Sequence, residues 1–165
     1  MPPELTVTPV GQNTLADYTR PELVVPAVRE CDAAGIISEL SHLLQRQGCV
    51  ADVLPLYHTA LNQELLSNSA QTCGIALPHA RLSGVKQLQF AFGRTPQPVT
   101  WGPKGSHAVQ LIFLLAVPAT DAASYLHLLA TLARLSQQPE RLENLRAAPD
   151  VQSLISELER IRLKP

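Results

Sequence analysis

The feature that most constrains the fold is the run of residues 109–117, which is apolar at every position except Gln110. A strand with one face in water alternates apolar and polar residues, whereas a nearly unbroken apolar run is typical of a central strand covered on both faces. Pro118 ends the run. Its longest uninterrupted part is far shorter than the roughly 20 apolar residues that a membrane-spanning helix requires. The run therefore predicts a buried strand rather than a membrane span.

Apolar residues at helical spacing predict helices before and after this strand. Asp32 is placed to cap a helix over about residues 33–47, and Gly48 suits the left-handed position after its end. Asp52 caps a second helix, and its predicted apolar face consists of Val53, Tyr57, Ala60, Leu61 and Leu65. After Pro118, Thr120 or Asp121 caps a third helix, and shorter helices are predicted over residues 139–148 and 149–163.

Shorter patterns predict the remaining strands. Residues 23–25 precede Pro26, and residues 87–92 alternate with a period of two. Residues 96–105 are a turn-rich connection with room for a short strand at 99–101, and residues 1–13 form a flexible leader. The order strand, two helices, two or three strands and three helices predicts one layered α/β/α domain over residues 14–165, with a mixed sheet flanked by helices.

The charge balance argues against polyanionic partners. Thirteen Lys and Arg against 14 Asp and Glu give a net charge of −1, so we expect neither nucleic-acid binding nor insertion into a membrane. The three cysteines follow no disulfide pattern, and residues 1–10 lack the positively charged stretch and apolar run of a secretory signal. These features predict a cytoplasmic protein.

His79 is the histidine in the most unusual local setting. Pro78 fixes its own φ and biases Leu77 toward extended backbone, which places the imidazole on a stiffened turn between a helix and a strand. A positioned, partly exposed neutral imidazole is a competent nucleophile near neutral pH. A Pro-His pair alone is more often an ordinary surface or packing histidine, so its sequence context has to decide.

That context is the segment Gly74-Ile75-Ala76-Leu77-Pro78-His79-Ala80-Arg81. It resembles the phosphorylation-site motif of the fructose/mannitol/nitrogen-type IIA domains of the bacterial phosphoenolpyruvate-dependent phosphotransferase system, and it follows two predicted helices, as in that family. Residues 109–118, 125–134 and 153–158 resemble the family's apolar strand, following helix and C-terminal end. The resemblance spans about residues 14–163.

The resemblance implies a phosphocarrier with a phosphohistidine intermediate rather than a stand-alone enzyme. It makes His79 the phosphoryl acceptor, a histidine phosphocarrier protein the donor, and a IIB domain or a regulatory target protein the recipient. It implies no cofactor and no metal. Because no IIB or membrane segment is fused within these 165 residues, it favours the nitrogen-regulatory type over a sugar-transport component.

The sequence departs from the family pattern at two positions. Gln63 stands where the family has an arginine, and a neutral amide loses the bidentate charged contact that a guanidinium makes with phosphate. Tyr125 stands where the family has a second active-site histidine, and it either donates its hydroxyl to the site or packs in the core. His127 lies about 200° around the helix from Tyr125 and is rejected as a substitute.

Two further residues are candidates for supporting roles. Arg81 can supply the positive charge that Gln63 lacks, and Thr120 lies at a helix N-terminus that would favour a nearby phosphate. Two rival functions stay open. One is a regulatory protein-binding module in which phosphotransfer is slow or lost, and the other is a metal-dependent hydrolase that uses His79 with His58 or His107.

Overall fold

The computed structural model describes residues 14–67, 69–70, 73–102 and 107–163. The predicted leader, residues 1–13, lies outside them, as does part of the predicted turn-rich connection. No helix among the described residues is long and apolar enough to cross a membrane.

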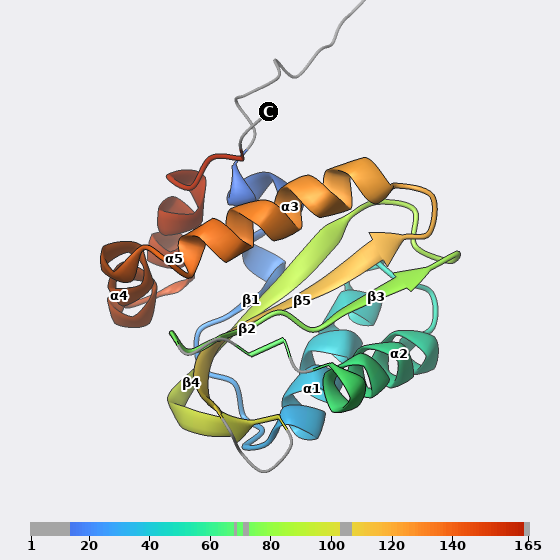
Figure 1. Ribbon diagram of the computed structural model, residues 1–165, viewed down its shortest axis with the longest axis horizontal. Coiled ribbons are helices and arrows are strands. Elements are labelled where there is room, and N and C mark those ends of the chain that lie inside the picture. Colours follow the sequence, from blue (N-terminus) through green and yellow to red (C-terminus); the bar gives the residue numbers. More distant parts are fainter. Residues whose placement is uncertain (1–13, 68, 71–72, 103–106, 164–165) are drawn as a thin grey trace, which may run out of the picture.

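One mixed sheet organises the described chain, with β5 (His107–Pro118) near its middle (Figure 1). β5 pairs antiparallel with β4 (Gln89–Trp101) and parallel with both β2 (Ile75–Ala76) and β3 (His79–Leu82). β1 (Val24–Val25) pairs parallel with the far side of β4. Residues 111–118 are all buried, so the central strand predicted from its apolar run is confirmed.

Helices cover both faces of the sheet (Figure 1). α1 (Ala33–Arg46) and α2 (Val53–Leu66) lie on one face, and α3 (Ala122–Leu135), α4 (Pro139–Ala147) and α5 (Val151–Glu159) lie on the other. Alternate residues of β5 enter two separate hydrophobic cores: Leu111, Phe113 and Leu115 pack toward α3–α5, and Ile112, Leu114 and Ala116 pack toward α1 and α2. The layered α/β/α fold is therefore confirmed.

The helix signals in the sequence match the structure closely. The Asp32 side chain accepts a hydrogen bond from the Gly35 backbone N–H at 2.7 Å, and Asp52 accepts one from Leu54 at 3.3 Å. Gly48 follows α1 with φ of 80°, in the left-handed region where glycine is favoured. The last helix ends at Glu159, short of the predicted residue 163.

The predicted buried face of α2 is wrong by part of a turn. Its buried residues are Leu56, Ala60 and Glu64, whereas Leu65, assigned to the apolar face, is 64% exposed. Glu64 takes the inward position because its carboxylate accepts a hydrogen bond from the buried Trp101 indole. A specific polar contact thus overrides the apolar pattern.

The strand at residues 99–101 is not separate, because β4 runs unbroken from Gln89 to Trp101. Its register against β5 shifts between Arg94 and Val99. Pro96 and Pro98 lie within this irregular stretch, where the regular hydrogen-bond pattern between β4 and β5 is already interrupted and a residue without an N–H is tolerated. The predicted turn is therefore an irregular stretch of one long strand.

Candidate functional site

His79 begins β3 on the outer side of β5, not in the predicted turn. The backbone N–H of Leu115 donates to the Pro78 carbonyl at 2.9 Å, and His79 is in register with Leu115. Pro78 has no N–H to donate, but its carbonyl accepts the first hydrogen bond between β3 and β5. This bond anchors the backbone next to His79 to the central strand. The imidazole is half-buried and remains open to solvent.

A carbonyl in the connection between β2 and β3 holds the imidazole in one tautomer. Nδ1 lies 3.1 Å from the Leu77 carbonyl oxygen. Because a carbonyl oxygen only accepts, Nδ1 carries the proton in this contact, and Nε2 holds the lone pair. The nucleophilic nitrogen is therefore Nε2, and among the described residues no hydrogen bond occupies it.

Tyr125, in the first turn of α3, lies beside His79. Their ring centroids are 5.6 Å apart with an interplanar angle of 42°. Burial raises the pKa of the Tyr125 hydroxyl, and the Arg81 guanidinium acts in the opposite direction. The phenol therefore stays protonated near neutral pH and can donate a hydrogen bond. The prediction that Tyr125 occupies the inward side of its helix agrees with its half-buried position.

Arg81 lies on the same face of β3 as His79, because side chains two residues apart on a strand point the same way. Its Nη2 donates to the Ala119 carbonyl at 2.8 Å, which fixes the guanidinium between the end of β5 and the start of α3. The side chain is otherwise exposed. Arg81 thus brings a positive charge to the edge of the site.

The start of α3 is capped by Asp121, whose carboxylate accepts from the Ser124 N–H at 3.1 Å. Of the two predicted caps, Asp121 is therefore the one used, and Thr120 is exposed in the preceding turn. A carboxylate at this position already offsets the helix dipole, which weakens any attraction of the helix end for phosphate. The supporting role of Thr120 stays a prediction.

Gln63 is exposed on α2, and its side chain makes no hydrogen bond or ring contact with His79. The structure therefore places Tyr125 beside His79 and Arg81 on the same face of β3, and among the described residues no hydrogen bond or ring contact joins Gln63 to them.

The next residue, Glu64, was missed by the sequence analysis and is a buried carboxylate whose hydrogen bonds lead to the site. Its side chain is 3% exposed, and its Oε1 accepts from the Trp101 indole N–H at 2.7 Å and from the Ser69 N–H at 3.2 Å. Ser69 in turn accepts from the Leu77 N–H at 2.8 Å. A relay of hydrogen bonds thus runs from β4 to the residue whose carbonyl orients His79. The sequence did hold a signal for this buried residue, because Glu64 is an isolated carboxylate in a largely apolar helix.

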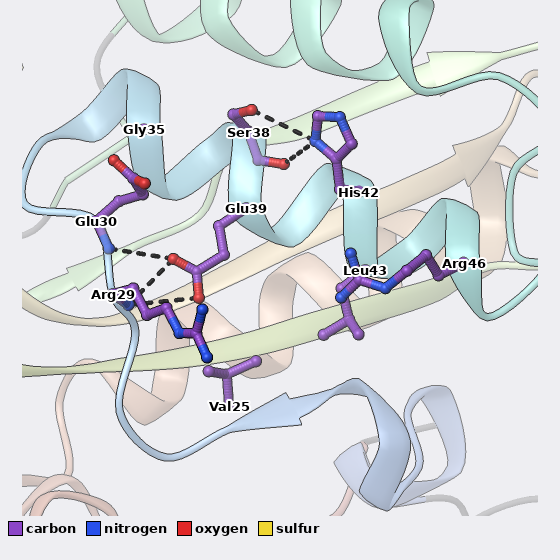
Figure 2. Close-up of a pocket in the computed structure, with 9 residues that line it drawn as sticks. All are labelled: Val25, Arg29, Glu30, Gly35, Ser38, Glu39, His42, Leu43 and Arg46. Atoms are coloured by element: carbon purple, nitrogen blue, oxygen red, sulfur yellow. Dashed lines mark hydrogen bonds between the residues drawn. The ribbon is translucent and has the colours of Figure 1, made fainter.

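Three other histidines, His42, His58 and His127, are exposed on helices. His127 is exposed on α3, and His42 Nδ1 bonds the Ser38 carbonyl at 2.8 Å on α1. His42 lines a cavity of about 630 Å³ in which Glu39 accepts from two backbone N–H groups, those of Arg29 and Glu30 (Figure 2). Among the described residues, no group of three or more His, Cys, Asp or Glu side chains could hold a metal ion.

Comparison with known proteins identifies the family of the chain. Residues 18–161 match the model of the phosphoenolpyruvate-dependent sugar phosphotransferase system, EIIA 2. The nitrogen regulatory protein of Bradyrhizobium diazoefficiens is 29% identical over 149 residues, which cover 87% of this chain and 94% of that protein.

Solved structures share the fold. The nitrogen regulatory protein IIA-Ntr of Neisseria meningitidis superposes with a TM-score of 0.71 at 27% identity, over 87% of this chain and 98% of that one. The enzyme IIA of the Escherichia coli mannitol system, solved in complex with phosphorylated enzyme IIB, gives a TM-score of 0.68 at 17% identity over 83% and 94% of the chains, a likeness of fold alone. With the family model matching most of its length, the chain belongs to the EIIA 2 family of the phosphoenolpyruvate-dependent sugar phosphotransferase system.

Proposed function

We propose that this chain is a nitrogen-regulatory type of IIA phosphocarrier and that His79 accepts and passes on a phosphoryl group. The observation that carries the proposal is the hydrogen bond from His79 Nδ1 to the Leu77 carbonyl, which leaves the lone pair of the ring on Nε2. The half-buried position of the ring supports the same role, because a visiting protein has to reach Nε2.

In the proposed step, the lone pair of His79 Nε2 attacks the phosphorus atom carried by the donor. The new P–N bond forms as the P–N bond to the donor imidazole breaks, and the electron pair of that bond stays on the donor nitrogen. The Nδ1 proton stays hydrogen-bonded to the Leu77 carbonyl oxygen, and the partial negative charge of that oxygen stabilises the positive charge that develops on the ring. The reverse sequence releases the group to the acceptor.

The phosphoryl group brings nearly two negative charges to the site at neutral pH. Arg81 supplies a fixed guanidinium at the edge of the site, and the protonated hydroxyl of Tyr125 supplies a neutral donor beside the ring. We propose that these two groups replace the arginine and histidine of the family pattern. Gln63, exposed on α2, then contributes little to the phosphorylated state.

The proposed donor is a histidine phosphocarrier protein, and the recipient is a IIB domain or a regulatory target protein. The mannitol IIA structure, which was solved with its phosphorylated IIB partner, supports the first kind of recipient through its shared fold. The nitrogen regulatory protein of Bradyrhizobium supports the second, through its identity over most of both chains.

The test is phosphorylation of the full chain by phosphoenolpyruvate, the general phosphotransferase enzyme and the histidine phosphocarrier, followed by intact-mass measurement. We expect the wild type to gain the mass of one phosphoryl group, His79→Ala to gain none, and His127→Ala, an exposed histidine elsewhere, to match the wild type. Equal labelling of His79→Ala, or an unlabelled wild type with a known IIA protein labelled in parallel, would overturn the proposal.

A second candidate function is a protein-binding module in which phosphotransfer is slow. The neutral, exposed Gln63 favours it, because the site then holds fewer charged contacts for phosphate than the family pattern implies. The time course of labelling decides between the two, with Gln63→Arg as the diagnostic variant. Prompt labelling of the wild type supports the carrier, and labelling that becomes prompt only in Gln63→Arg supports the module.

A further inference from the structure

We propose that Ser69 is a positioning residue for His79, and that it acts through the Leu77 backbone without touching the ring. The Leu77 N–H donates to Ser69 Oγ at 2.8 Å, and the Leu77 carbonyl oxygen lies 3.1 Å from His79 Nδ1. One residue therefore gives its N–H to one side chain and its carbonyl to another. In this arrangement the first hydrogen bond fixes the second.

The register of the sheet explains why Leu77 needs these two partners. β2 and β3 pair with β5 in the same register, so they are two parts of one strand that is interrupted at Leu77 and Pro78. The Pro78 carbonyl accepts from the Leu115 N–H and therefore points toward β5. Because the backbone groups of successive residues in a strand point in opposite directions, those of Leu77 point away from β5. No described strand pairs with that outer edge.

The outward groups of an edge strand are ordinarily left to water. Leu77, however, is 5% exposed, so its N–H requires a partner within the protein. The Ser69 hydroxyl is that partner. Without it, the N–H is left unpaired or the backbone turns to find water, and in either case the carbonyl that orients His79 loses its fixed direction.

Ser69 is itself held in place by Glu64. The Ser69 N–H donates to Glu64 Oε1 at 3.2 Å, and the same oxygen accepts from the Trp101 indole N–H at 2.7 Å. Glu64 is 3% exposed and forms no ion pair with the described residues, so its carboxylate depends on such donors for the cost of burial to be offset. The chain that follows α2 is thereby tied to β4, which fixes the Ser69 hydroxyl opposite Leu77.

The chemical consequence concerns the tautomer of His79. Only the form with a proton on Nδ1 has its lone pair on Nε2, and in an unrestrained histidine the form with the proton on Nε2 is the commoner one. Loss of the Ser69 hydroxyl should therefore increase the Nε2–H form, which has no lone pair on the nucleophilic nitrogen. The inference rests on the proposed function for its meaning in phosphotransfer, but the tautomer can be measured without a phosphoryl donor.

The test is the tautomer of His79 in the unphosphorylated full chain, measured by long-range proton–nitrogen NMR correlations at mildly alkaline pH, with His79→Ala to identify the signals. We expect the Nδ1–H form to dominate in the wild type and Ser69→Ala to lower the ratio of Nδ1–H to Nε2–H by about threefold or more, the effect of one hydrogen bond. The matched control is Ser67→Ala. It removes an exposed hydroxyl of the same connection that makes no hydrogen bond with the described residues, and its ratio should equal that of the wild type.

A second pair of variants, Ser69→Thr and Ser69→Val, has nearly the same shape and differs in the hydroxyl. The threonine variant should keep the wild-type ratio, and the valine variant should lose it as Ser69→Ala does. Thermal melts establish that each variant is folded. An unchanged ratio in Ser69→Ala and Ser69→Val, or an equal fall in Ser67→Ala, would overturn the proposal. Unfolding of both the alanine and the valine variant would make Ser69 a structural residue and would overturn it as well.

Labelling by the phosphotransferase components then connects the tautomer to the reaction. The labelling rate of Ser69→Ala should fall at least in proportion to the fraction of His79 in the Nδ1–H form, since only that form presents a lone pair on Nε2. The two proposals fail separately. An unlabelled wild type refutes the phosphocarrier function whatever the tautomer, and a tautomer ratio that does not respond refutes the role of Ser69 however fast the labelling is.

Discussion

Replacing Arg94 with methionine tests how the sheet is tied to the helices of one face. The Arg94 guanidinium, on β4, donates through Nη1 to three carbonyls at the end of α4, those of Leu145 at 2.9 Å, Arg146 at 3.1 Å and Ala148 at 2.6 Å. Its Nε donates to the Pro26 carbonyl at 3.0 Å. One side chain thus donates hydrogen bonds both to carbonyl groups at the end of α4 and to a carbonyl in the loop after β1.

The expected loss follows from these contacts. A hydrogen bond to a charged group contributes roughly 1.5–3 kcal/mol, and one Nη1 has only two hydrogens for its three carbonyls. Because the side chain is part-buried, we count two such bonds at the lower end of that range, or about 3 kcal/mol in the free energy of unfolding. Methionine keeps most of the aliphatic stem. For a chain of 165 residues, that loss lowers the Tm by roughly 6–12 °C.

Urea denaturation and calorimetry measure the effect, with Arg29→Met as the control. The Arg29 side chain is exposed and makes no hydrogen bond with the described residues, so its replacement should change the free energy of unfolding by less than about 0.5 kcal/mol. A loss below about 1 kcal/mol in Arg94→Met, or one equal to that of the control, would refute the idea that this guanidinium ties α4 to the sheet.

Three further predictions concern the site, its support and acid stability. Tyr125→Phe should slow labelling of His79 by about threefold to tenfold without changing the Tm, since it removes one neutral hydrogen-bond donor; unchanged labelling would limit Tyr125 to packing. Trp101→Phe should lower the free energy of unfolding in urea by about 2–4 kcal/mol, because it strips a donor from buried Glu64; Glu64→Gln, which keeps an acceptor, should cost less. The hydrogen bond from the Ser153 N–H lowers the pKa of the Asp150 carboxyl below its ordinary 3.8. The stability that Asp150 adds, relative to Asp150→Ala, is therefore fully present above pH 3.8 and is lost as the pH falls through the lowered pKa. Urea melts at neutral pH and near pH 3 should therefore show the gap closing, and a constant gap would contradict the cap.

The parts of the fold that local sequence determines could be predicted. Aspartate caps such as Asp32 and Asp52 satisfy backbone groups within the next few residues, so their signal needs no knowledge of distant chain. The central strand was equally readable, because burial on both faces leaves a continuous apolar run.

The parts of the fold that depend on distant partners could not be predicted from the sequence. β2 and β3 are two and four residues long, too short for a periodic pattern, and they are strands only because β5 supplies their hydrogen-bond partners. The inward turn of Glu64 likewise depends on Trp101, 37 residues further along the chain. His79 could be singled out from its motif, but its tautomer and its contact with Tyr125 required the fold.

The relay that orients His79 has a practical consequence, because the indole that begins it belongs to the only tryptophan in the chain. Tryptophan emission from this protein therefore comes from a single buried indole, whose N–H donates to the Glu64 carboxylate. Any event at the imidazole that is transmitted back through Leu77 and Ser69 would change that emission. The molecule thus carries its own optical reporter, readable in stopped-flow without a label.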